Sequence, residues 1–190
     1  MFCVFSILPL VGAAQTEDSF KQYFHPNGKV ASEGYLVDGK PEGHWKAYYD
    51  TGVLKSEGDR VRFLLDSTWK FYGPDAKLMS TIQYQADRKN GPLRKFAADG
   101  SLVSEELYRD DIKNGDTKYF FPNGKLQKVI PFKEGREEGK AIEYAEDGRI
   151  IGLATYRAGV LQRREEINRY DKAGLRQGPW KEFNANGKPK

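Results

Sequence analysis

The sequence has few residues from which a reactive centre could be built. Among its 190 residues are one cysteine, Cys3, and two histidines, His25 and His44. Cysteine–histidine catalysis, a thiolate zinc site and a disulfide framework all need more of these residues than the chain contains. Carboxylate chemistry is still permitted by the 27 Asp and Glu residues. We nevertheless expect no enzyme, no cofactor and no metal site, because no other feature of the sequence points to a cleft.

Long hydrophobic runs are also missing. Hydrophobic residues make up 38% of the chain and charged residues 31%, and no stretch reaches the roughly 20 apolar residues of a membrane-spanning helix. Aromatic residues reach 13%, with 20 Gly, which favours short strands and turns over a disordered chain. A net charge of +4 is too small to indicate nucleic acid as the partner.

Residues 1–14 resemble a signal peptide. They carry no charge, the apolar run from Phe2 to Val11 has the length of a signal-peptide core, and Gly12 to Ala14 are small. The Lys or Arg that usually opens such a segment is absent, and a hydrophobic first strand is the alternative. We predict cleavage before Gln15 and an exported protein, periplasmic or secreted.

The main feature of the sequence is a repeat of 24 residues. The repeats start, as position 0, at Ser19, Gly43, Ser67, Gly91, Gly115 and Gly139. Position +2 holds Trp45, Trp69 and Leu93, and Trp180 restarts the pattern near the C-terminus. Position +5 is always aromatic: Phe24, Tyr48, Tyr72, Phe96, Phe120 and Tyr144. Position +9 is glycine in five repeats: Gly28, Gly52, Gly100, Gly124 and Gly148.

The turns within each repeat predict its shape. Asn27-Gly28 and Asp99-Gly100 are short-hairpin signals, because Asn, Asp and Gly accept positive φ. Two turns in 24 residues leave room for two short strands. We therefore predict an all-β fold, an elongated and curved single-layer antiparallel meander of repeated β-hairpins. Strand alternation would place positions +5, +11 and +17 on one face, as a single aromatic ladder.

The predicted organisation has four parts: a signal peptide at 1–14, six hairpin repeats at 19–162, an irregular connector at 163–177 and a partial terminal repeat at 178–190. A family likeness covers Phe20 to about Gln162 and returns at Ile167–Lys188, and two segments illustrate it: Tyr23–Trp45 (YFHPNGKVASEGYLVDGKPEGHW) and Tyr119–Gly139 (YFFPNGKLQKVIPFKEGREEG). They resemble the MORN-repeat variant family, whose bacterial members are often labelled antitoxins of the YwqK type. The resemblance implies a hairpin array that binds other molecules. The chain departs from the family pattern at Ser67, Ala76 and Arg60.

The candidate partner-binding residues form a basic ladder and a set of tryptophans. Position +3 holds Lys46, Lys70, Arg94 and Lys118, each two residues before an aromatic residue. Such a ladder could bind an anionic polymer by charge and stacking, or it could only cover the aromatic residues. Trp45, Trp69 and Trp180 could stack on a ligand or pack inside the repeat.

The function that the sequence favours is a non-catalytic scaffold that binds another macromolecule, a protein above all, in the cell envelope or outside the cell. Binding of an anionic polymer or a membrane surface through the basic ladder is an alternative, and neutralisation of a toxin is another. Neither a small-molecule substrate nor nucleic acid is expected. Glu33, Glu57 and Glu105 recur at position +14, where carboxylate pairs are expected to be solvated cross-strand partners of lysine.

Overall fold

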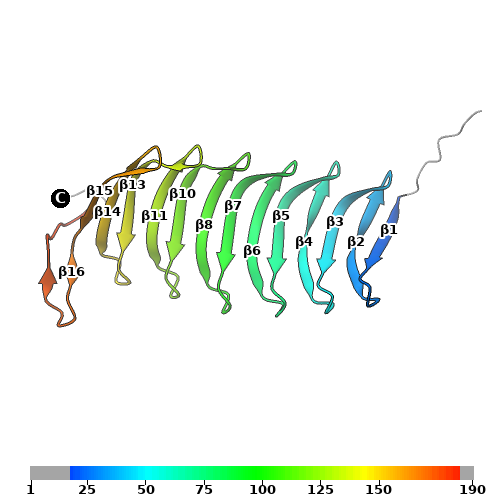
Figure 1. Ribbon diagram of the computed structural model, residues 1–190, viewed down its shortest axis with the longest axis horizontal. Helices are drawn as coiled ribbons and strands as arrows, with labels where there is room; N and C mark the ends of the chain where they lie inside the picture. The colour runs from blue at the N-terminus through cyan, green and yellow to red at the C-terminus, as the bar shows by residue number, and fades with distance from the viewer. Residues whose placement is uncertain (1–17, 185–190) are drawn as a thin grey trace, which may run out of the picture.

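The structure is a computed structural model that describes residues 18–184, and these residues form one long antiparallel sheet with a small hairpin at its C-terminal end (Figure 1). The long sheet has 15 strands and the small one has two. The described residues contain no helix. The predicted all-β, single-layer antiparallel meander is therefore confirmed.

Each repeat supplies a hairpin, and strands that follow one another in sequence pair in space. The short strands β9 and β12 extend the pairing of β8 and β11. The strands are β1 (Ser19–Phe24), β2 (Val30–Val37), β3 (Lys40–Tyr48), β4 (Leu54–Val61), β5 (Leu64–Tyr72), β6 (Leu78–Gln85), β7 (Arg88–Phe96), β8 (Leu102–Arg109), β9 (Ile112–Lys113), β10 (Gly115–Phe120), β11 (Leu126–Lys133), β12 (Arg136–Glu137), β13 (Gly139–Tyr144), β14 (Ile150–Arg157), β15 (Val160–Glu166), β16 (Arg169–Tyr170) and β17 (Arg176–Gln177).

The turn inside each hairpin has one geometry throughout. In the first repeat the His25 amide donates to the Lys29 carbonyl (2.8 Å), and the Gly28 amide donates to the His25 carbonyl (2.9 Å). Gly28 has φ of 82°, which explains the glycine column at position +9. Ala76 adopts the same left-handed conformation with φ of 62°, at some cost in strain.

The expectation of one continuous aromatic ladder is wrong, because every hairpin contains a β-bulge. Phe24 pairs with Val30 and Tyr23 pairs with Ser32, which leaves Ala31 as an extra residue. The extra residue reverses the alternation of side chains along the second strand. Positions +5 and +11 therefore share one face, and position +17 points to the other. The corresponding extra residues in the other hairpins are Lys55, Met79, Val103, Gln127 and Ile151.

The best-buried column runs along position +2. Trp45, Trp69 and Leu93 are each 8% exposed. The column continues through Thr117 and Ala141, which are also buried. In the early repeats the indole lies across a neighbouring glycine: a Cβ built on Gly34 would fall 2.5 Å from Trp45, and one on Gly58 would fall 2.4 Å from Trp69. Glycine at these positions makes room for the ring.

Side chains also join several neighbouring repeats at both rows of turns. The Glu42 carboxylate accepts the backbone amides of Arg62 (3.1 Å) and Phe63 (2.7 Å) in the following repeat. On the opposite row the Tyr49 hydroxyl donates to the Tyr72 carbonyl at 2.9 Å. These bonds satisfy turn groups that the strand ladders leave free. They also fix the distance between neighbouring repeats.

The C-terminal end of the sheet differs from the irregular connector predicted at residues 163–177. Residues 163–166 are not irregular, because they lie in β15 and pair with β14. β16 and β17 then form a separate hairpin within the same predicted segment. The buried Asn168 holds the end of the chain through bonds to the Ile150 carbonyl (3.0 Å) and to the Lys181 backbone. No strand forms in 178–184, the described part of the predicted terminal repeat, and the predicted signal peptide at 1–14 lies outside the described residues.

Candidate functional site

The sheet presents two chemically different faces. We call the face that carries Trp45, Trp69, Leu93, Thr117 and Ala141 the tryptophan face. Position +3 points to the other side, which we call the ion-pair face, and it carries Lys46, Lys70, Arg94 and Lys118. The two assignments follow from consecutive partners: Lys46 pairs with Glu33, whereas Trp45 pairs with Gly34.

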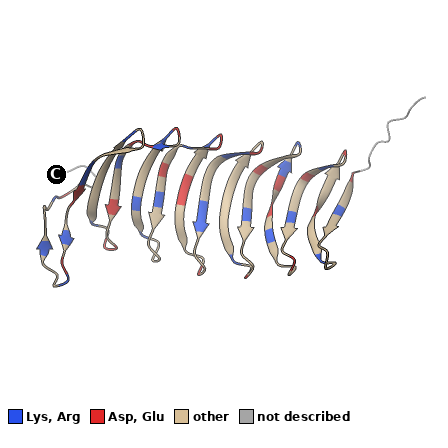
Figure 2. Ribbon diagram, in the orientation of Figure 1, with Lys and Arg blue, Asp and Glu red and all other residues tan. Residues whose placement is uncertain are grey.

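The predicted basic ladder is paired with carboxylates across the strands. Arg94 contacts Glu105 at 2.8 Å and Lys118 contacts the same carboxylate at 3.6 Å. Lys70 lies 3.3 Å from Glu57. Figure 2 shows the same mixture on a larger scale, with basic and acidic positions on neighbouring strands. The ladder that the sequence suggests for anionic polymers is therefore largely neutralised by its own neighbours.

The position +5 tyrosines complete this network. The Tyr48 hydroxyl donates to Glu33 at 2.6 Å, and the Tyr72 hydroxyl donates to Glu57 at 2.8 Å. These hydrogen bonds lower the pKa of both carboxyl groups. Burial and the adjacent carboxylate raise the pKa of Tyr48 and of Tyr72 to about 12. These position +5 tyrosines thus bond to carboxylates on the neighbouring strand. Phe24, at the open end of the sheet, is 59% exposed.

The remaining members of the position +5 column have partly buried side chains and occupy the same place in their hairpins. They are Phe96, Phe120 and Tyr144, and each pairs with the aliphatic residue at position +11.

The tryptophans that the sequence offers for ligand stacking occupy packing positions. The Trp45 indole N–H donates to the carbonyls of Tyr35 (3.1 Å) and Glu42 (3.2 Å), and that of Trp69 donates to the Asp59 carbonyl (3.0 Å). Their burial leaves little ring surface for a partner. Trp180 packs apart from these two, against Tyr170 with ring centroids 5.1 Å apart.

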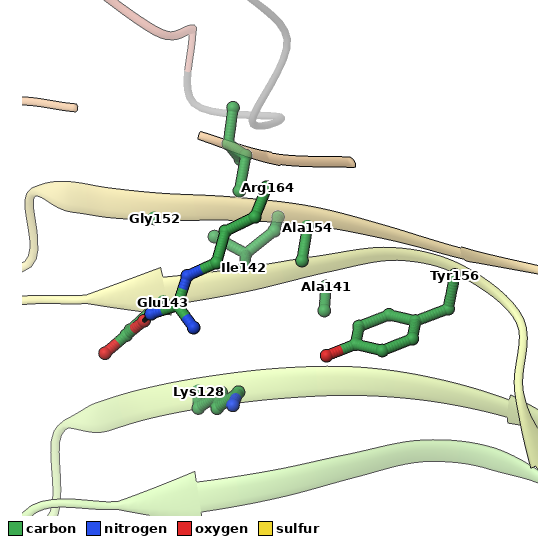
Figure 3. Close-up of a pocket in the computed structure, with 9 residues that line it drawn as sticks. Lys128, Ala141, Ile142, Glu143, Gly152, Ala154, Tyr156 and Arg164 are labelled. Atoms are coloured by element: carbon green, nitrogen blue, oxygen red, sulfur yellow. Dashed lines mark ion pairs between the residues drawn. The ribbon is translucent and has the colours of Figure 1, made fainter. Parts of the chain in front are cut away.

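The tryptophan face has a hollow near its C-terminal end (Figure 3). It opens to solvent, and the space it bounds, the open solvent above it included, is about 310 Å³. Small residues form its floor, namely Ala141, Gly152 and Ala154. Figure 3 shows the Tyr156 ring at one end and the Arg164 side chain reaching across toward Glu143.

The hollow exists because the bulk along position +2 decreases from Trp to Ala along the sheet. In the third repeat Ile82 pairs with both Trp69 and Leu93, whereas in the sixth repeat Ala141 pairs with Ala154. The rim is charged: Arg164 lies 3.9 Å from Glu143 and 3.6 Å from Glu166, and Lys128 lines the same space. Our sequence reasoning missed this site, although the size trend along position +2 could have indicated it.

A second charged cluster, around Glu106, is structural. Lys113 contacts Glu106 at 2.9 Å, Lys95 at 3.3 Å, and the Tyr108 hydroxyl donates to it at 2.9 Å. Burial raises the pKa of Glu106, but these partners outweigh burial and lower it. Within residues 18–184 we find no group of three His, Cys, Asp or Glu that could hold a metal ion. The same part of the chain contains no helix suited to crossing a membrane.

A single-layer sheet built from hairpins that recur every 24 residues defines a β-hairpin repeat protein. The MORN repeat variant family matches the chain at residues 21–38, 41–60, 113–134 and 176–190. The chain is thus similar to that family in four segments, and MORN repeats in general bind proteins or membranes. Among curated proteins no match to this chain is found.

Proposed function

We propose that this protein is a non-catalytic repeat scaffold that binds another protein through the tryptophan face. The observation that carries this proposal is the hollow over Ala141 and Ala154, an open recess with an aromatic wall and a charged rim. Recesses of this kind receive protruding side chains of a partner, with the apolar floor supplying contact area and the charged rim supplying orientation.

The charge arrangement favours a protein over an anionic polymer as the partner. An anionic polymer needs a row of cations free to meet its charges. On the ion-pair face, Arg94 and Lys118 share Glu105, and Lys70 lies against Glu57. A protein surface carries both signs and can match such a mixture.

The proposed place of action is the cell envelope or the outside of the cell, as a periplasmic or secreted protein. Support comes from the uncharged, apolar composition of residues 1–14 and the small residues before Gln15. Mass spectrometry of protein expressed with its leader should give a new N-terminus near Gln15. An intact N-terminus on cytoplasmic protein would contradict export.

The binding experiment compares a variant that fills the hollow with a variant that adds the same side chain to the opposite face. Ala154→Phe places a ring on the floor of the hollow, and Thr155→Phe places the same ring one residue along, on the other face. The full chain and both variants serve as baits for cell-envelope extract, with captured proteins quantified by mass spectrometry. We expect a partner that is captured by the wild type and by Thr155→Phe and is lost with Ala154→Phe.

Circular dichroism and a denaturant melt of both variants establish that they remain folded. A partner retained by folded Ala154→Phe would contradict binding at the hollow. Capture that instead weakens with salt and with Lys118→Ala would identify the anionic-polymer alternative.

A further inference from the structure

Among the described residues, the first strand of the sheet is an unpaired edge with an unusual composition. In the repeats that follow, the first strand pairs on both sides, as β3 does with β2 and β4. Within residues 18–184, β1 pairs only with β2. Five of its six residues are exposed, among them Phe20 (50%), Tyr23 (50%) and Phe24 (59%).

The edge strands at the two ends of the long sheet differ in charge. β15, at the other end, has four charged residues among seven (VLQRREE), and charge on an edge strand discourages pairing with another chain. β1 (SFKQYF) has a single charge, Lys21. An exposed, aromatic, nearly uncharged edge is a template for an added strand.

The hydrogen-bonding direction of β1 follows from its turn. The His25 amide points inward, because it donates to the Lys29 carbonyl of the same hairpin. Backbone groups alternate in direction along a strand, so Tyr23 and Lys21 also bond toward β2. The backbone groups of Phe20, Gln22 and Phe24 therefore point outward, where an added strand would bond.

The outward register is self-complementary in an antiparallel pair. With Gln22 opposite its own copy, Phe20 lies opposite Phe24 of the second chain on the ion-pair face. On the tryptophan face Lys21 then lies opposite Tyr23 of the second chain, a cation–π arrangement. Aromatic cross-strand pairs stabilise a sheet, whereas centring the pair on Lys21 would place two like charges opposite each other.

We propose that two copies of this chain pair antiparallel through β1, with Gln22 on the two-fold axis, to form one continuous sheet. Because each copy uses the same edge, no β1 edge remains for a third chain, and the charged β15 edges lie at the outer ends. The dimer is independent of the partner site proposed at the hollow, because β13 and β14, which line the hollow, lie at the other end of the sheet (Figure 1).

The first test removes one outward amide. Proline at position 22 lacks that N–H but leaves the inward bonds of Lys21 and Tyr23, and Gln22→Thr keeps the amide as a matched control. Light scattering after size exclusion, over a range of concentrations of the full chain, should show a dimer for wild type and Gln22→Thr. Gln22→Pro should raise the dimer Kd at least about tenfold, as expected for a lost hydrogen bond and its neighbours.

The second test traps the register. In a Cys3→Ser background, Gln22→Cys places two thiols on a hydrogen-bonded pair with Cα atoms about 5.5 Å apart, within disulfide range. Ser19→Cys is the control, because its two copies would lie about 20 Å apart along the strands. Oxidation should cross-link Gln22→Cys as a dimer and leave Ser19→Cys monomeric.

Three results would overturn pairing through β1: a wild-type monomer at every accessible concentration, a dimer unaffected by Gln22→Pro, and equal cross-linking at both positions. A fourth result, higher oligomers in place of a dimer, would contradict the two-fold closure. Circular dichroism and a melt of Gln22→Pro confirm that any monomer is folded.

Discussion

The second and third repeats bury their tryptophan face differently from the fifth and sixth. In the early repeats one large ring covers a bare backbone, as Trp69 does at Gly58. In the later repeats Thr117 pairs with Ile130 and Ala141 with Ala154, so the contact is shared between smaller side chains. The register within the hairpins is the same in both regions, although the first strand of a repeat is continuous in the early region (β5) and interrupted in the late one (β12 and β13). The hairpin register therefore does not depend on one kind of core residue, and side-chain size along position +2 can change until a hollow opens.

We expect the largest loss of stability from a substitution in the early repeats. Trp69→Ala removes a buried ring whose face also carries Arg60, with the guanidinium 5.8 Å from the ring centroid. We expect the free energy of unfolding to fall by about 3–5 kcal/mol. Thr117→Ala, in the late region, should cost about 1 kcal/mol. Denaturant melts of both variants measure the difference, and equal losses would mean that the tryptophan is not the main contributor to its region.

A second prediction concerns the glycines beneath the rings. Gly58→Ala would place a Cβ 2.4 Å from the Trp69 ring, so the ring must move, at a cost of about 1–3 kcal/mol. Gly152→Ala, in the late region, meets the flexible Glu143 carboxylate at 3.0 Å and should cost less. The double variant Gly58→Ala/Trp69→Ala should be less destabilised than the sum of the two single changes. Additive losses in thermal melts would argue against the ring–glycine contact.

The third prediction uses pH and the ion-pair face. The Tyr72 hydroxyl, with a smaller contribution from Lys70, lowers the pKa of Glu57 below its ordinary 4.5 in the folded chain. The stabilisation is therefore fully present above pH 4.5 and is lost as the pH falls through the lowered value. Tyr72→Phe should cost about 1.5 kcal/mol near neutral pH and progressively less in acid. A cost that stays constant down to pH 3 in denaturant melts would exclude this linkage.

The smallest expected effect is on the basic ladder. Lys118 is a partly exposed side chain, 3.6 Å from a carboxylate that Arg94 already contacts more closely. Lys118→Ala should change the free energy of unfolding by less than about 1 kcal/mol, and the change should shrink with added salt. A chemical melt in low and high salt checks it. A larger, salt-insensitive loss would show that the lysine stem packs against the sheet.

The sequence was sufficient to predict the repeat length, the hairpin turns and the all-β class, because Asn-Gly and Asp-Gly signals recur at a fixed spacing. It did not predict the face of each column. One unpaired residue per hairpin, such as Ala31, reverses the alternation, and nothing in residue type marks Ala31 as a bulge. Residues 163–166 were misassigned because their charges resemble a solvated linker, although charges are also what an edge strand carries. The hollow forms because small residues such as Ala141 and Ala154 meet across neighbouring strands, and no single sequence motif shows that combination.

The sequential order of the hairpins in one long sheet has a mechanical consequence. A load applied between the two ends of the sheet would pull neighbouring strands directly apart, so their hydrogen bonds would be loaded one after another. The array should then lengthen in discrete steps as single hairpins detach. Each released repeat of 24 residues would add up to about 80 Å of extended chain, which gives the protein the response of an extensible tether.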